Sequence, residues 1–147
     1  MLLQLLICMI ATISFAILFT APKSELIFCG LAGTLGWFFY LICIDQGAGK
    51  PVANLVASFA LTVFSRVIAS MRKNPVTVYL IAGIFPLVPG AGIYNMSFYF
   101  IMNEMELCSA AGMETIKVAG AIVLGIIFGF TLPQGWFNAI PKWKKHR

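Results

Sequence analysis

The chain has 147 residues, of which 61% are hydrophobic and only 10% charged, and its formal net charge is +5. Its mean hydropathy is +0.95. A soluble domain of this length needs a polar exterior, which this composition does not supply, so the class of water-soluble globular proteins is excluded. Continuous apolar runs also argue against a transmembrane β-barrel, whose strands alternate apolar and polar residues. The sequence therefore predicts an all-α, polytopic integral membrane protein.

Five apolar segments are long enough to cross a bilayer, whose core of about 30 Å needs roughly 20 helical residues. They lie at residues 2–20, 26–44, 52–71, 76–102 and 118–137. The first is interpreted as a retained helix, because it lacks the basic start of a cleaved signal and has Pro22 near its end. The connections are too short for a soluble domain, so we expect residues 1–147 to form one transmembrane domain.

Small residues recur in the second and last segments. Gly30, Gly33 and Gly36 follow one another at three-residue spacing, and Gly125 and Gly129 form a G-x-x-x-G pair. In lipid, small residues let two helix backbones approach closely and gain dispersion contacts. These glycines are expected to pack helices together, either within the chain or against a partner subunit, and a homo-oligomer is one such partner.

The third segment carries Arg66 and a row of polar residues. An arginine in a membrane helix is costly unless it reaches the interface or serves a function. Arg66 either extends toward the cytoplasmic surface or faces the bundle interior and attracts an anionic substrate. On the same helix, polar residues at three- and four-residue spacing line a transport pathway or form interhelical hydrogen bonds. These residues are Asn54, Ser58, Thr62 and Ser65.

The fourth segment contains the stretch "FPLVPGAGIYN". Pro86 and Pro89 each lack a backbone donor, and Gly90 and Gly92 tolerate the angles of a break. This pattern predicts two half-helices joined between Pro86 and Gly90, although a simple proline kink remains an alternative. Irregular backbone at membrane depth persists only where protein or a watery cavity covers it.

The start of the second half-helix is a candidate substrate site near the middle of the membrane. Free N–H groups and the positive end of the helix dipole bind anions there, as in secondary transporters. The expected carboxylate donors are the amides of Gly90, Ala91, Gly92 and Ile93, and Tyr94 and Asn95 follow as hydrogen-bonding side chains. The full candidate substrate site is Pro86, Pro89, Gly90, Ala91, Gly92, Tyr94, Asn95 and Arg66.

The distribution of basic residues predicts the orientation. Five crossings place the termini on opposite sides, and an outside N-terminus leaves eight basic residues in the cytoplasm and only Lys50 and Lys117 outside. Because basic loops stay in the cytoplasm, this orientation is predicted. The tail "PKWKKHR" is then a cytoplasmic anchor at lipid headgroups, and we expect no nucleic-acid binding.

Enzymatic chemistry is not expected. The only histidine, His146, lies in the tail, no two acids share a membrane-helix face, and the four cysteines do not cluster. The sequence therefore offers no base for a nucleophile and no set of metal ligands, and we expect neither a metal nor a cofactor.

Three stretches, "GLAGTLGWFFY", "SRVIASMRKNP" and "PLVPGAGIYN", resemble the threonine/serine exporter family. The chain is similar, from about Leu26 to Gly135, to the small stand-alone subunit that corresponds to the C-terminal membrane half of the single-chain exporters. The resemblance implies a secondary exporter of small amino acids in the bacterial cytoplasmic membrane. It also implies a larger membrane subunit as partner and a small carboxylate-bearing substrate.

Two alternative functions remain open. Relatives of the family export a dicarboxylate such as succinate, and a carboxylate site at a broken helix fits both substrate classes. A non-transporting accessory subunit, which stabilises a larger protein through its glycine faces, is the other alternative.

Overall fold

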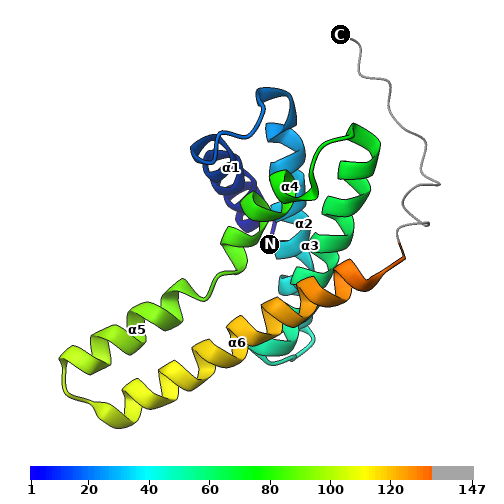
Figure 1. The fold of residues 1–147 in the computed structure, drawn as a ribbon. Coiled ribbons are helices and arrows are strands. Elements are labelled where there is room, and N and C mark those ends of the chain that lie inside the picture. The colour runs from blue at the N-terminus through cyan, green and yellow to red at the C-terminus, as the bar shows by residue number, and fades with distance from the viewer. Residues whose placement is uncertain (134–147) are drawn as a thin grey trace.

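The computed structural model describes residues 1–133, and these are almost entirely helical (Figure 1). This confirms the predicted all-α class. Two short 3-10 turns, η1 (Lys23–Glu25) and η2 (Phe85–Leu87), accompany six α-helices. The α-helices are α1 (Leu2–Leu18), α2 (Leu26–Asp45), α3 (Lys50–Arg72), α4 (Val76–Ile84), α5 (Gly90–Ile101) and α6 (Met105–Thr131).

The helices form a bundle with a projecting arm. Helices α1 to α4 pack together, and the C-terminal half of α6 lies against α3. Helix α5 and the N-terminal half of α6 make an antiparallel hairpin that extends away from this bundle (Figure 1). Helix α5 packs mainly against α6 and has no buried residue.

Three helical segments are long and apolar enough to cross a membrane, namely Lys23–Asp45, Lys50–Arg72 and Met105–Thr131. The pair Val76–Leu87 and Gly90–Ile101, bent by 46°, would make a fourth. The remaining predicted segment is α1, an apolar helix of 17 residues that is shorter than the other candidates. The structure thus supports a multi-pass membrane protein.

The last helix begins earlier than predicted. Helix α6 starts at Met105 instead of Val118, so most of the expected connection from Asn103 to Lys117 is helical. Hydropathy marks where a helix becomes apolar, whereas the Met, Glu, Leu and Ala residues of this stretch favour a helix without making an apolar run. The predicted continuation to Phe137 and the basic tail lie outside the described residues.

The break in the fourth segment is confirmed. Helix α4 ends at Ile84, η2 follows, and α5 starts at Gly90. Val88 and Pro89 between them have ψ angles of 131° and 54°, which are not helical. The break lies at the proline–glycine stretch because neither proline can donate the hydrogen bond that would continue the helix.

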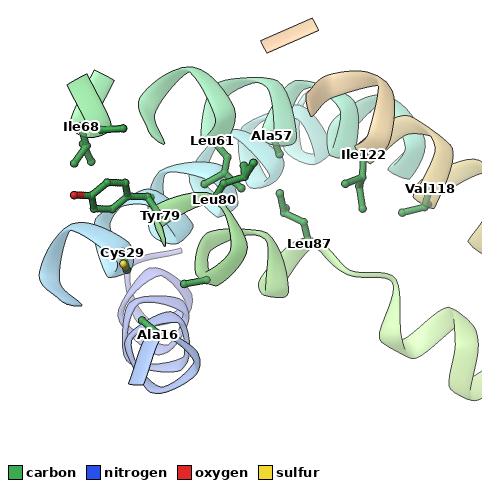
Figure 2. Packing of buried hydrophobic residues seen from close by; sticks show 13 residues of the cluster. Ala16, Cys29, Ala57, Leu61, Ile68, Tyr79, Leu80, Leu87, Val118 and Ile122 are labelled. Carbon is green, nitrogen blue, oxygen red and sulfur yellow. The ribbon is translucent and has the colours of Figure 1, made fainter. Parts of the chain in front are cut away.

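The core lies where α1 to α4 meet the C-terminal half of α6. Figure 2 shows side chains from different helices converging there, among them Cys29, Leu61, Tyr79, Leu87 and Ile122. Leu61 of α3 is fully buried. It contacts a close crossing of α2 and α4, where a Cβ atom on Gly83 would lie 2.6 Å from Leu61 Cδ1 and 3.3 Å from the Gly33 nitrogen.

The glycines of the second segment pack within the chain. A Cβ atom on Gly30 would lie 2.8 Å from Ile13 Cγ1 of α1, and one on Gly33 would overlap the Thr12 side chain. A Cβ atom on Gly36 would lie 3.4 Å from Leu61 Cβ of α3, an ordinary contact distance.

Gly125 and Gly129 of α6 likewise pack against α3. A Cβ atom on Gly125 would overlap the Ser58 hydroxyl, and one on Gly129 would lie 2.6 Å from Thr62 Cβ. These two glycines therefore pack α6 against α3 within the chain, which is the first of the two alternatives given above.

Replacing Gly125 with alanine is expected to destabilise the fold. The added methyl would lie 2.5 Å from the Leu55 carbonyl oxygen and 3.0 Å from the Phe59 nitrogen, which are backbone atoms that cannot rotate away. Overpacking of this kind costs about 1–3 kcal/mol. The readout is the thermal unfolding midpoint in detergent.

The matched control is Gly120→Ala on the same helix, where the added methyl meets nothing within 4 Å. Its stability should change by less than about 1 kcal/mol. Equal midpoints for the two variants would show that the α3–α6 contact tolerates a wider spacing.

Candidate functional site

A cavity of about 370 Å³ lies at the break between η2 and α5. Its size falls in the range of about 300–1,000 Å³ that is typical of small-molecule sites. Six residues of the predicted site line it, namely Pro86, Pro89, Gly90, Ala91, Gly92 and Asn95. The remaining walls come from the C-terminal half of α2, the first turns of α3 and the middle of α6. The predicted half-helix junction therefore borders an open space.

Two backbone donors at the start of α5 are free. The Gly90 amide donates to the Val88 carbonyl at 2.7 Å, and the Ile93 amide donates to the Pro89 carbonyl at 3.1 Å. Within residues 1–133, no group accepts a hydrogen bond from the amides of Ala91 and Gly92. Two of the four predicted donors are thus available to an anion, at the positive end of the helix dipole.

The cavity also contains an ion pair. Lys50, the first residue of α3, lies with its Nζ atom 2.9 Å from Glu114 Oε1 on α6, and both side chains are more than half exposed. The sequence does not predict this pair, because Glu114 lies in the connection before the apolar segment 118–137, where no helix position is specified. The helix-forming composition around Glu114 was the one signal that would have extended α6.

Further polar and aromatic groups complete the walls. Trp37 and Tyr40 of α2 stack with their ring centroids 4.9 Å apart and form one side. Asn54 of α3 and Thr115 of α6 also line the space. Since Lys50 and Asn54 belong to the first two turns of α3, the cavity lies near one end of that candidate span, where charged groups are less costly than in its middle.

Two residues of the predicted site lie elsewhere. Tyr94 is 68% exposed and stacks on Phe98, on the arm rather than in the cavity. Arg66 is only 5% exposed, and its Nη1 atom donates to the carbonyls of Gly129 at 2.7 Å and Leu132 at 2.9 Å. Helix ends leave carbonyls unsatisfied, so Arg66 stabilises the end of α6. Neither interpretation of Arg66 from the sequence included this contact.

The polar row on α3 is mostly covered by α6. Ser58 donates to the Leu55 carbonyl and Thr62 to the Ser58 carbonyl, so both hydroxyls bond to their own helix. Ser65 is fully buried, and its hydroxyl has no partner among the described residues. Asn54 is the member of this row that lines the cavity.

A buried polar cluster joins the connection between α1 and α2 to the connection between α3 and α4. Glu25 is fully buried and accepts hydrogen bonds from Arg72 at 2.8 and 3.0 Å, from the Tyr79 hydroxyl at 2.8 Å and from Ser24 at 3.1 Å. Asn74 donates to the Tyr79 hydroxyl at 3.2 Å. None of these residues lines the cavity, so the cluster holds the fold at the junctions α1–α2 and α3–α4.

The family described as "Threonine/Serine exporter, ThrE" matches residues 4–131. Over 121 residues the chain is 28% identical to a "Probable threonine/serine exporter" of Mycobacterium tuberculosis. This match covers 82% of this chain and 22% of that protein. Over 117 residues it is 26% identical to a "Threonine/serine exporter" of Corynebacterium glutamicum. This match covers 79% of this chain and 24% of that protein. The chain thus matches less than a quarter of each of these relatives. No solved structure matches it.

Proposed function

The chain belongs to the threonine/serine exporter family, and from this premise we propose that it is a subunit of a secondary exporter of small amino acids. In this proposal it works with a larger membrane subunit, and the substrate's carboxylate binds at the start of α5. Membership of a transporter family also agrees with the expectation that the chain is not an enzyme.

The cavity at the broken helix is the observation that carries this proposal. It brings together the two free amides of Ala91 and Gly92 and the side chain of Asn95 beside a space large enough for a small metabolite. A carboxylate at this place satisfies both amides and interacts favourably with the helix dipole. A proline kink with fully satisfied amides would offer neither.

Two observations support the proposed partnership with a larger subunit. The chain matches only 22% and 24% of the two relatives' lengths. Its helix α5 has no buried residue within the described structure. A second set of membrane helices beside the arm would cover α5 and complete a pathway that includes the cavity. Location in the bacterial cytoplasmic membrane, with the N-terminus outside, belongs to the same proposal.

The test is efflux of labelled threonine, serine and succinate from bacteria that express this chain, the larger exporter-family protein of the same source, both or neither. We expect threonine or serine efflux only when both are present, and at least tenfold above the empty strain. If only succinate is exported, the substrate is a dicarboxylate and not an amino acid. Efflux that persists without this chain would assign it an accessory role.

A further inference from the structure

The cavity at the broken helix contains one positive and one negative side chain, and its ion pair is accessible. Lys50 and Glu114 are the formally charged residues that line it among residues 1–133. Their side chains are 61% and 53% exposed. Exposed ion pairs are weak because water screens them, so a ligand can separate this one and replace each partner.

We propose that Lys50 and Glu114 bind the two charged groups of a zwitterionic α-amino acid, and that Glu114 selects this class of substrate over dicarboxylates. The proposal rests on the function proposed above and names the residues that choose the substrate. The ligand's carboxylate takes the place of Glu114 beside Lys50, and its ammonium group pairs with Glu114. Each side chain thereby exchanges one ionic partner for another of the same sign.

The placement of Glu114 on α6 brings it close to the free amides. Its neighbour Thr115 lies directly against the start of α5, since a Cβ atom on Gly92 would overlap the Thr115 hydroxyl. The amides of Ala91 and Gly92 and the pair Lys50–Glu114 therefore border one space. A carboxylate between Lys50 and these amides has positive partners on two sides, which leaves Glu114 for the ammonium group.

The charges in the cavity discriminate between the two substrate classes. A zwitterion has no net charge and contributes one group for each sign. A dicarboxylate has no cation for Glu114, and its second negative group would be repelled by that carboxylate at short range. The free amides alone attract any carboxylate, so Glu114 is the residue that separates amino acids from dicarboxylates.

The experiment compares efflux of labelled threonine and succinate for the wild type, Glu114→Gln and Lys50→Gln, each with the larger subunit and at matched membrane abundance. Glu114→Gln should lower threonine efflux at least tenfold without lowering succinate efflux. Lys50→Gln should lower efflux of every carboxylate that the wild type exports. Glu106→Gln, an exposed acid on the same helix outside the cavity, is the matched control and should behave as the wild type.

The charge swap Lys50→Glu/Glu114→Lys separates recognition from structure. If the pair only holds α3 to α6, the swapped charges would still attract each other, and the double variant would regain the efflux that the single variants lose. Recognition predicts no return, because the swap places a carboxylate where the ligand's carboxylate must bind. The unfolding midpoint in detergent, with and without threonine, identifies variants that fail to fold. Threonine should raise the midpoint of the wild type but not that of Glu114→Gln.

Several results would overturn the inference. Equal loss of threonine and succinate efflux in Glu114→Gln, unchanged threonine efflux in that variant, or rescue by the charge swap would each do so. A wild type that exports succinate but not threonine would overturn the inference and leave the exporter function standing. A wild type that exports neither would overturn the proposed function and with it this inference.

Discussion

Replacing Gly90 with leucine is expected to reduce efflux at least tenfold while leaving the fold intact. Gly90 lines the cavity, and a Cβ atom there meets nothing within 4 Å. Its φ is not among the positive values of the described chain, so a leucine adopts this backbone without strain. The new side chain fills the cavity beside the free amides of Ala91 and Gly92 and excludes the carboxylate from them.

The matched control is Gly120→Leu on α6. A Cβ atom on Gly120 also meets nothing within 4 Å, but Gly120 does not line the cavity. Both variants should reach the membrane in the amount of the wild type, as measured by immunoblot, and only Gly90→Leu should lose efflux of labelled substrate. Wild-type efflux from Gly90→Leu would show that the cavity is not the substrate site and would favour the accessory role.

Removing the carboxylate of Glu25 should be among the most destabilising changes in this chain. Glu25 is fully buried, and the side chain of its partner Arg72 is only 17% exposed. Glu25→Ala leaves the guanidinium and the Tyr79 hydroxyl without their acceptor in a desolvated place. Breaking a buried ion pair by removing one partner costs about 3–5 kcal/mol.

The measurement is the thermal unfolding midpoint in detergent for Glu25→Ala, Arg72→Ala and the double variant. Because the penalty comes from an unpaired buried charge, the double variant should recover part of the loss in either single variant. Glu106→Ala, which removes an exposed acid, is the control and should leave the midpoint near that of the wild type. A Glu25→Ala midpoint equal to the control would show that water reaches Arg72.

The helices and the break follow from local sequence. Long apolar runs fold as helices in a bilayer because every backbone group must be hydrogen-bonded within the segment. Pro86 and Pro89 end α4 because they lack the backbone donor, and Gly90 starts α5. Helix α6 starts at Met105, ahead of the apolar segment predicted from Val118, since a helix that begins with mixed residues gives no hydropathy signal.

The sequence by itself determined the all-α class, the place of the broken helix and the backbone at that break, which forms one wall of the cavity, because these depend on residues close together in the chain. The tertiary structure alone decided the side-chain partners. It brought Lys50 to Glu114, placed Arg66 at the last carbonyls of α6, and buried Glu25 against Arg72. Each of these contacts joins residues on different helices or connections, and their meeting depends on how the helices cross, which no local pattern specifies.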